Sequence, residues 1–301
     1  MGFLLKKIFK KNIMKRKGIL LAGGSGTRLF PVTKVISKQL LPIHDKPMIY
    51  YSLSTLMMAG IREVIIISTA RDINFFKDLF GDGADLGMKF EYAVQKKPEG
   101  IAQSIIIAEK FLKKSPFALM LGDNIFYGNN FSKILKKISS RKNTTVFAYH
   151  VKDPGRYGVV ESDKKGNAIS LEEKPKKPKS NFAVTGLYFY NNSAIKVAKN
   201  LKPSARNELE ITDLNKFFLK NKKLKVEYLN RGFAWLDAGT FESFYECSQL
   251  ISAIEKRQDI KIGCIEEIAF NNKWINKDDL KKKVLSYGKS EYGNYLKKII
   301  K

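Results

Sequence analysis

A glycine-rich stretch near the N-terminus constrains the fold more than any other part of the sequence. It spans Lys17 to Pro47 and reads KGILLAGGSGTRLFPVTKVISKQLLPIHDKP. The apolar run from Gly18 to Ala22 is typical of a buried parallel strand. The GGSGT segment that follows disfavours strand and helix, but its backbone N–H groups can approach an anion closely. With the charges of Arg28 and Lys38 added, the stretch predicts a polyphosphate-binding loop.

The loop does not match the two most familiar phosphate-binding motifs. No Gly-Lys-Ser or Gly-Lys-Thr follows it, so it is not a P-loop. Gly24 and Gly26 have the spacing of the first two glycines of a dinucleotide fingerprint, but Leu29 stands where the third is required. Taken alone, the loop also fits an ordinary turn after a strand. The assignment therefore depends on the rest of the sequence.

Composition limits the class of partner. The chain has 301 residues and a formal net charge of +26. A nucleic-acid partner is one interpretation of this charge, but the lysines are spread through most segments and no zinc, RRM or KH signature occurs. We therefore expect no nucleic-acid partner, and a field that favours anionic small substrates. No stretch approaches the roughly 18 to 20 apolar residues of a membrane span. Cys247 and Cys264 match no metal spacing, and we expect ordinary thiols in a reducing, cytoplasmic compartment.

Hydrophobic periodicity predicts an α/β fold. In the first half, helices and strands alternate: helices are expected at 48–59, 72–80 and 100–112, and strands at 63–68, 89–94 and 117–121. This alternation is typical of a mostly parallel sheet flanked by helices. After about residue 140 we expect a less regular region, with strands at 144–151, 157–162, 168–172, 184–190 and 225–229. A helix at 241–256 and several short helices from 258 onward complete the prediction.

Two aspartates follow predicted strands directly. Asp123 comes after the strand at 117–121, and Asp237 stands where an apolar segment meets a loop. A carboxylate at the end of a buried strand is unfavourable unless it is paired or bound to a cation. Beside a phosphate-binding loop, Mg²⁺ is the cation that carboxylate oxygens would bind. The alternative is that each aspartate simply caps a helix, before Phe126 and Phe241 respectively.

Several strings together resemble the sugar-nucleotide pyrophosphorylases of the sugar nucleotidyltransferase family. They are GGSGTRLxPxT, KxLLP and DKPMIYY in the first part, and RYGVV, EEKP, VTGLY and WLDAGT in the second. The resemblance covers about Lys15 to the C-terminus and is nearest to the members that transfer thymidylyl groups. It implies a Rossmann-like nucleotidyltransferase fold with a sugar-binding insertion and a C-terminal helical segment. The implied reaction joins dTTP and α-D-glucose 1-phosphate into dTDP-glucose and pyrophosphate, with Mg²⁺ as cofactor.

The same resemblance assigns roles to individual residues. It implies that Arg28, Lys38, Asp123 and Asp237 are catalytic, and that Asp123 and Asp237 hold Mg²⁺. The residues implied to bind the nucleotide are Leu21, Gly23, Gly24, Ser25, Gly26, Thr27, Arg28, Lys38, Gln95, Gly100 and Asp123. Gln95 and Gly100 would read the thymine edge. The residues implied to bind the sugar phosphate are Gly158, Glu173, Lys174, Val184 and Tyr188, with Lys174 pairing with the phosphate.

Domain organisation follows from the extent of the resemblance. We expect a dispensable basic extension at 1–14, with Met14 as an alternative start. A nucleotidyltransferase domain should span 15–257, with a nucleotide half at about 15–140 and a sugar-phosphate half at about 141–257. A helical segment at 258–301 should pack on the same domain. The resemblance also implies a homotetramer with feedback inhibition by dTDP-rhamnose, the end product of a deoxysugar pathway.

Small departures from the family pattern remove no proposed catalytic group. His44 stands where relatives usually have Tyr, and Lys96-Lys97 replaces a less charged pair. Ala238 replaces Thr in the WLDAGT string. Two alternatives stay open: an enzyme that uses UTP or another nucleotide or sugar phosphate, and a non-catalytic sugar-nucleotide sensor. We expect His44 to have a packing role, because nucleotidyl transfer needs no strong base.

Overall fold

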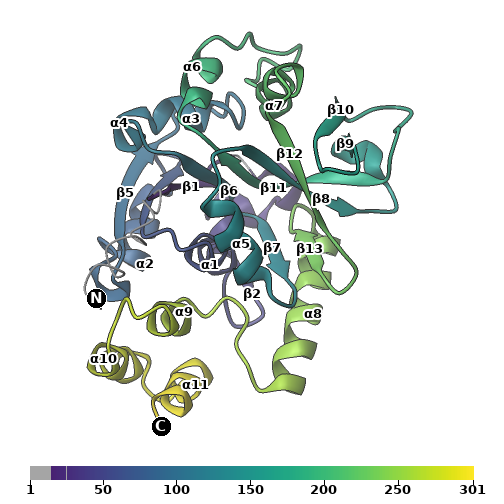
Figure 1. The fold of residues 1–301 in the computed structure, drawn as a ribbon. Coiled ribbons are helices and arrows are strands. Elements are labelled where there is room, and N and C mark those ends of the chain that lie inside the picture. The colour runs from purple at the N-terminus through teal and green to yellow at the C-terminus, as the bar shows by residue number, and fades with distance from the viewer. Residues whose placement is uncertain (1–14, 25) are drawn as a thin grey trace, which may run out of the picture.

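A nine-stranded sheet forms the centre of the described part of the chain (Figure 1). The computed structural model describes residues 15–24 and 26–301; the expected extension at 1–14 and the loop residue Ser25 lie outside them. The strands of this sheet are β1 (Lys17–Ala22), β4 (Glu63–Ser68), β5 (Lys89–Val94), β6 (Phe117–Leu121), β8 (Thr144–His150), β9 (Gly158–Ser162), β10 (Ala168–Glu173), β11 (Phe182–Tyr190) and β12 (Leu224–Leu229). The predicted strands are all confirmed, to within about two residues at either end.

The order of the strands places the glycine-rich loop at the middle of one sheet edge. β1 pairs in parallel with β4 on one side and β6 on the other, and β4 continues in parallel to β5. β11 then runs antiparallel to β6 and to β8. β1, β4, β5 and β6 therefore all end at the same edge, so the loops that follow them are neighbours. A mixed sheet results, with the parallel half formed by the first part of the chain.

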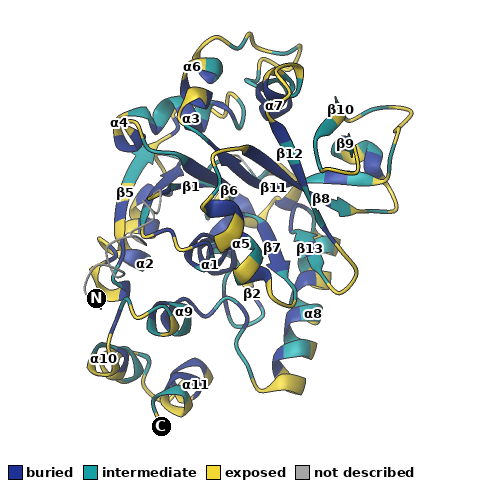
Figure 2. Cartoon of the chain, in the orientation of Figure 1, coloured by how far each residue is buried: buried dark blue, intermediate teal, exposed yellow. Residues whose placement is uncertain are grey.

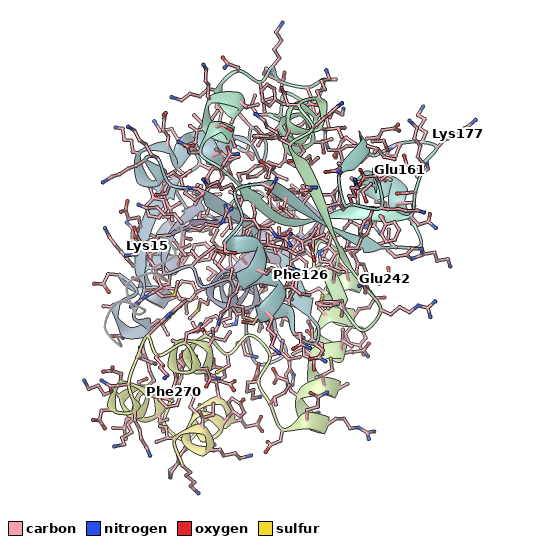
Figure 3. All side chains as sticks on the ribbon, viewed as in Figure 1. Lys15, Phe126, Glu161, Lys177, Glu242 and Phe270 are labelled. Carbon is pink, nitrogen blue, oxygen red and sulfur yellow. The ribbon has the colours of Figure 1, made fainter. Side chains whose placement is uncertain are left out.

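Two small ribbons lie off this sheet. β7 (Asn124–Tyr127) pairs antiparallel with β13 (Ala234–Asp237), and β2 (Pro42–Ile43) pairs with β3 (Lys46–Pro47). β9 and β10 pair antiparallel as a hairpin, which extends from one side of the molecule. The exposed Lys177, in the connection after β10, projects into solvent there (Figure 3).

Helices cover both faces of the central sheet. Their bounds are α1 (Ile49–Met58), α2 (Ile73–Phe80), α3 (Gln103–Ile107), α4 (Glu109–Leu112), α5 (Phe131–Ser139), α6 (Ser193–Lys199), α7 (Ile211–Lys220), α8 (Phe241–Gln258), α9 (Ile265–Asn271), α10 (Lys277–Tyr287) and α11 (Glu291–Ile300). Successive β1 residues point to opposite faces: Leu20 joins the core under α1 and α5, and Ile19 joins the core under α3 and α7. Figure 2 shows buried strands between helices with exposed outer faces.

The prediction of one continuous helix at 100–112 is wrong, because the helix begins later and is interrupted. The helix begins at Gln103 and divides into α3 and α4 around Ala108. Residues 99–102 are held instead by a distant segment, because Leu209 donates its N–H to the Glu99 carbonyl (2.7 Å) and accepts from Ala102 N–H (3.1 Å). Gly100 has φ +103°, and a Cβ there would lie 2.4 Å from the Leu209 carbonyl oxygen. A tertiary contact therefore overrides local helix propensity.

The chain after α8 folds as three helices. α9 packs against α1, and α10 packs against α11. Tyr287 and Tyr292 pack on the core and donate their hydroxyls to the buried Glu266 carboxylate at 2.7 and 2.6 Å. Cys247 and Cys264 are free, buried thiols. None of the helices within residues 15–24 and 26–301 combines the length and apolar character needed to cross a membrane.

Candidate active site

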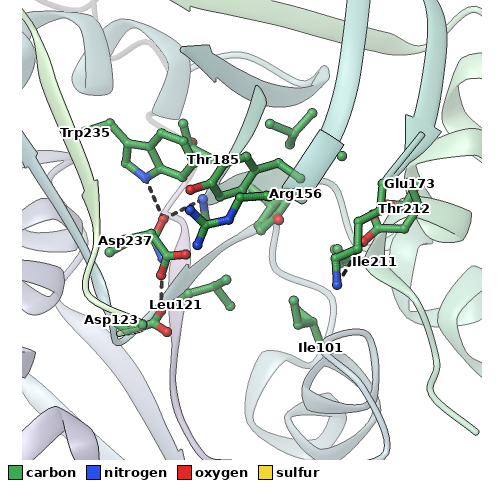
Figure 4. A pocket seen from close by; sticks show the side chains of 18 of the residues that line it. Ile101, Leu121, Asp123, Arg156, Glu173, Thr185, Ile211, Thr212, Trp235 and Asp237 are labelled. Atoms are coloured by element: carbon green, nitrogen blue, oxygen red, sulfur yellow. Dashed lines mark hydrogen bonds and ion pairs between the residues drawn. The ribbon is translucent and has the colours of Figure 1, made fainter. Parts of the chain in front are cut away.

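A cavity of about 530 Å³ opens at the edge where β6 ends. Its wall combines loops of the first half of the chain with β9, β10, β11 and β13 (Figure 4). Nine residues expected in the site line it: Arg28, Lys38, Asp123, Gly158, Glu173, Lys174, Val184, Tyr188 and Asp237. Figure 4 shows Asp123 and Asp237 together at one end, and Glu173 with Thr212 at the other. The two chemical halves expected from the sequence therefore face one space.

The β7–β13 ribbon brings the two aspartates together. Asp237 is opposite Asn124 in the ribbon, and Ala238 N–H donates to the Asp123 carbonyl at 3.1 Å. The helix-cap alternatives are both wrong. Asp123 precedes strand β7 rather than a helix, and the N-cap of α8 is Thr240, whose side chain accepts from Ser243 N–H. Neither aspartate is used as a cap.

Charge is concentrated around this pair. Lys38 Nζ donates to Asp123 Oδ2 at 2.5 Å. Burial acts to raise the pKa of Asp123, but the charge and hydrogen bond of Lys38 outweigh it and the pKa is lowered. Burial acts to lower the pKa of Lys38, but Asp123 reverses the effect and the pKa is raised. Both groups are therefore ionised at neutral pH.

Asp237 is in the opposite situation. Burial, and then the negative charge of Asp123, raise the pKa of Asp237 to about 6. Lys38, Arg28 and Arg156 act to lower it, but they do not cancel these effects. A buried carboxylate that ionises with difficulty beside another carboxylate is a site that gains from an added cation.

These two carboxylates fit a divalent cation. Mg²⁺ prefers carboxylate oxygens and often uses one or two of them together with substrate phosphates. A second cluster, formed by His44, Asp45 and Glu255, also has possible metal-ligand atoms close together. There, however, Lys46 Nζ lies 3.0 Å from Glu255 Oε1, and Lys261 Nζ lies 2.9 Å from Glu255 Oε2. Lysines already neutralise that group, so the Asp123–Asp237 pair is the better candidate for a metal site.

His44 belongs to this second group rather than to an apolar packing position. Its Nε2 lies 3.7 Å from Glu255 Oε2, and its side chain is only 23% exposed. His44 does not line the cavity. His44 therefore packs against a cluster of charged side chains that joins β2, β3 and α8, and its expected packing role is made more specific by this contact.

Asn124 contacts a candidate site residue and was not predicted from the sequence. Its Nδ2 donates to Asp123 Oδ1 at 3.0 Å, and its Oδ1 accepts from Trp235 Nε1 at 2.7 Å and from Gly186 N–H at 2.9 Å. The side chain is 3% exposed. Asn124 therefore fixes the Asp123 carboxylate against two strands that are distant in sequence. The only sequence signal was its place directly after Asp123.

The far end of the cavity offers polar groups of a different kind. Glu173 Oε2 accepts from Thr212 Oγ1 at 2.5 Å, and Glu173 Oε1 lies 4.0 Å from Arg206. Lys174 has φ +42°, an uncommon conformation for a residue with a side chain, and its N–H donates to the Tyr157 carbonyl at 3.0 Å. Thr212 and Tyr157 also line the cavity and were not singled out from the sequence. Unusual backbone of this kind is often retained at ligand sites.

The other residues that are expected to bind the nucleotide form a second cluster beside the cavity. A Cβ on Gly23 would lie 2.5 Å from Gln95 Oε1 and 3.6 Å from a Leu21 methyl carbon. Gln95 Nε2 faces the Gly100 carbonyl at 3.4 Å. Leu21, Gly23, Gln95 and Gly100 are therefore brought together, and Ile101, next to Gly100, lines the cavity. Gly24, Gly26 and Thr27 continue the loop from here to Arg28.

Comparisons with known proteins agree with this arrangement. The family model described as nucleotidyl transferase matches residues 17–253. A glucose-1-phosphate thymidylyltransferase of Neisseria gonorrhoeae is 52% identical over 285 residues, which are 94% of this chain and 99% of that protein. The enzyme of the same name from Mycobacterium tuberculosis is 50% identical, with the same two coverages.

Solved structures give the same result. A Bacillus anthracis crystal structure with sucrose, described as a candidate glucose-1-phosphate thymidylyltransferase, is 39% identical with a TM-score of 0.71 and covers 78% of this chain and 94% of its own. The structure of a UDP-glucose pyrophosphorylase with UDP-glucose is 28% identical, with a TM-score of 0.71. The match covers 81% of this chain and 100% of that structure's chain. The chain therefore belongs to the nucleotidyl transferase family, among the glucose-1-phosphate thymidylyltransferases.

Proposed function

We propose that this protein transfers the thymidylyl group of dTTP to α-D-glucose 1-phosphate. A phosphate oxygen of the sugar phosphate attacks the α-phosphorus of dTTP, and the bond from that phosphorus to the α–β bridging oxygen breaks. The products are dTDP-glucose and pyrophosphate. The observation that supports this reaction is the cavity itself, with Asp123 and Asp237 at one end and Glu173 at the other. Lys38 is bonded to Asp123, and Lys174 Nζ lies 4.0 Å from Glu173 Oε1.

Electrostatic stabilisation is the main contribution of the protein. Lys38 is held ionised by Asp123, and Arg28 lies near Asp237, with Nη1 3.6 Å from where a Cβ on Gly239 would be. We assign both cations to the triphosphate, where they offset charge that grows as pyrophosphate leaves. Positioning of the two substrates supplies the rest, and no covalent bond to the protein forms.

Enzymes of this family generally depend on Mg²⁺. In this chain we assign Asp123 and Asp237 as its ligands, with Asn124 orienting Asp123. When bound there, Mg²⁺ would neutralise phosphate charge that the cationic side chains alone do not cover. Binding would also lower the pKa of Asp237, which burial and the charge of Asp123 raise.

The glycine-rich loop, residues 23–27, is assigned to the nucleotide together with Leu21, Gln95 and Gly100. Gln95 and Gly100 face the base in this assignment. Gly158, Val184 and Tyr188 are assigned to the glucose, Glu173 to its hydroxyls, and Lys174 to its phosphate. Ser25 has a proposed role in the loop but lies outside the described residues.

The wider organisation also remains a proposal. We propose a dispensable segment at 1–14, a catalytic domain at 15–257 and an accessory helical segment at 258–301. A homotetramer and feedback inhibition by dTDP-rhamnose stay predictions. A UTP-dependent enzyme is the alternative within the family, because the structural likeness extends to UDP-glucose pyrophosphorylase.

Product analysis tests the proposed reaction. Incubation with dTTP, glucose 1-phosphate and Mg²⁺ should give equimolar dTDP-glucose and pyrophosphate. Omission of the sugar phosphate should stop pyrophosphate release, since the proposed reaction uses the sugar phosphate, and not water, as the acceptor. Pyrophosphate release without sugar phosphate, or the absence of dTDP-glucose, would contradict the proposal.

A further inference from the structure

Three side chains beside the glycine-rich loop form a directed chain of hydrogen bonds, which we call the amide relay: Glu99, Gln103 and Gln95. Gln103 Nε2 donates to Glu99 Oε2 at 2.7 Å. Gln95 Nε2 donates to Gln103 Oε1 at 2.6 Å. Glu99 N–H also donates to Gln103 Oε1, at 3.3 Å. The relay connects the loop after β5 with the first residue of α3, and only Gln95 was singled out from the sequence.

The polarity of the relay is fixed at one end by a group that cannot donate. The Glu99 carboxylate only accepts hydrogen bonds when ionised, so Gln103 must turn its NH₂ towards Glu99. The Gln103 carbonyl oxygen then faces Gln95, and Gln95 must turn its own NH₂ towards Gln103. The Gly100 carbonyl, 3.4 Å from Gln95 Nε2, can also only accept and favours the same orientation. Both N–H groups of the Gln95 amide are thus engaged within the protein.

The remaining polar atom of the Gln95 side chain is its oxygen. Gln95 is 6% exposed, and its Oε1 faces Gly23, where a Cβ would lie only 2.5 Å away. The relay therefore presents an acceptor, and not a donor, to the glycine-rich loop. This refines the expectation that Gln95 and Gly100 read the thymine edge, because the Gln95 side chain would contribute an acceptor to that contact.

An acceptor at this place discriminates between bases by their ring nitrogens. Thymine and uracil carry a ring N–H on the pairing edge, whereas the equivalent cytosine nitrogen is an acceptor. Two acceptors placed opposite each other leave both groups without a hydrogen-bond donor, which is unfavourable when they are buried. We infer that Gln103 and Glu99 are specificity-determining positioning residues, which hold the Gln95 oxygen towards the base so that nucleotides with a ring N–H are selected. This inference rests on the proposed function, and in particular on the base lying beside Gly23.

Loss of the relay should allow the Gln95 amide to rotate and to offer its NH₂ to cytosine. In Gln103→Leu, the ratio of kcat/KM for dTTP to that for dCTP should fall by about tenfold or more, the size expected for one buried hydrogen-bond mismatch. The change should lie mainly in KM, and kcat with dTTP should stay within about threefold, because Gln103 does not line the cavity that holds Lys38 and Asp123. Glu99→Ala, at an exposed position, should lower the ratio in the same direction by a smaller factor.

A charge exchange supplies the matched control. In the double variant Glu99→Gln/Gln103→Glu, the residue at 103 can still only accept from Gln95, and the residue at 99 can donate to it. The ratio of dTTP to dCTP should therefore return to within about threefold of the wild-type value. Thermal unfolding should confirm that every variant is folded, and Glu99→Ala still tests the relay if Gln103→Leu does not fold.

The outcomes separate the inference from the proposed function. A wild-type protein that uses dCTP or a purine nucleotide best would overturn the assigned base choice, whatever the variants do. A wild-type preference for dTTP that is unchanged in folded Gln103→Leu or Glu99→Ala would overturn the inference and leave the proposed function standing. A lowered ratio that the double variant does not restore would show that packing, rather than amide polarity, carries the effect.

Discussion

Lys38 Nζ lies 2.5 Å from Asp123 Oδ2, although 85 residues separate the two in the chain. The pair gives the Asp123 carboxylate a salt-bridge partner in addition to its hydrogen bond from Asn124, and each charge raises the ionised fraction of the other. The neighbouring Asp237 gains less from this, because its pKa is raised to about 6 by burial and by Asp123. Lys38 therefore already neutralises Asp123, whereas an added cation beside Asp237 would be bound favourably.

The Lys38 ammonium should act mainly on charge that develops as pyrophosphate leaves. Lys38→Ala should therefore lower kcat by about a hundredfold or more, comparable to the loss of one preorganised donor. Lys34→Ala, at an exposed position that does not line the cavity, is the control and should keep near-normal turnover. Steady-state kinetics on both variants tests this, and a folded Lys38→Ala enzyme with normal kcat would remove Lys38 from the mechanism.

Asp123 and Asp237 should serve one Mg²⁺ site. Asp123→Asn and Asp237→Asn should each raise the Mg²⁺ concentration needed for half-maximal activity. The double variant should lose little more than the worse single variant, because either change disables the same site. Mg²⁺ titrations of activity measure this, whereas independent and additive losses would indicate two separate roles.

Asp237 should destabilise the metal-free fold at neutral pH. Its ordinary pKa of 3.8 is raised to about 6, so Asp237 binds its proton more tightly in the folded state than in the unfolded state. Between these two values, rising pH ionises the unfolded chain first and stability is lost until the folded pKa is passed. Without Mg²⁺ at about pH 8, Asp237→Asn should therefore raise the free energy of unfolding by roughly 1 to 3 kcal/mol.

The pH and metal dependence provide the control for that stability gain. At about pH 4 the gain should largely vanish, because Asp237 is then mostly protonated in the folded protein. Saturating Mg²⁺ should favour the wild type, since the variant binds it less well. Chemical denaturation at the two pH values measures both effects. Equal or lower stability of the variant at high pH without Mg²⁺ would contradict the raised pKa.

Thr212 should affect the sugar phosphate and not the nucleotide. Its hydroxyl donates to Glu173 Oε2 at 2.5 Å, so Thr212→Val should misplace that carboxylate. KM for glucose 1-phosphate should then rise by about tenfold, the effect expected from the loss of one hydrogen bond to a charged group. Ser170→Ala removes a bond of the same length to Glu161, away from the cavity, and should leave KM unchanged. Equal effects of the two variants, or a shift in KM for dTTP alone, would argue against the assignment.

The segment at 1–14 should be dispensable. Arg16 is 4% exposed and donates to the carbonyls of Ser139 and Tyr190, both at 2.7 Å. A chain that begins at Met14 keeps these bonds and should be as active and stable as the full chain. A chain that begins at Lys17 should lose at least about 1.5 kcal/mol of stability. Denaturation and activity measurements test both, and loss of activity on starting at Met14 would show that the extension contributes to the fold.

The sequence predicted those elements whose formation is local. β4, β5 and β6 begin and end at the predicted residues. β4 and β6 are short apolar runs, and β5 places the buried Phe90 between the charged Lys89 and Glu91. The helix expected from residue 100 failed because its first residues bond to Leu209, which no local pattern reveals. Family resemblance, rather than periodicity, placed the sugar-phosphate residues near the nucleotide loop.

The partners of the site residues were beyond local patterns for the same reason. Asn124 bonds to Gly186 and Trp235, which are 62 and 111 residues away. Both aspartates looked equally suited to capping a helix until the β7–β13 ribbon placed them together. The polarity of the Gln95 amide depends on a carboxylate and a carbonyl that only the folded loop brings within reach. Residue types were therefore readable from the sequence, whereas their orientation was not.

Nucleotide choice tests the central claim most directly. Pyrophosphate release with glucose 1-phosphate should be measured for dTTP, UTP, CTP and ATP, in the wild type and in Gln95→Ala. We predict that dTTP is used best and UTP measurably, with a modest gap because the thymine methyl adds about 1 kcal/mol of apolar contact. CTP should hardly be used, and Gln95→Ala should narrow the lead of dTTP over CTP. A best rate with CTP or ATP, or an unchanged ranking in Gln95→Ala, would contradict the thymidylyl assignment.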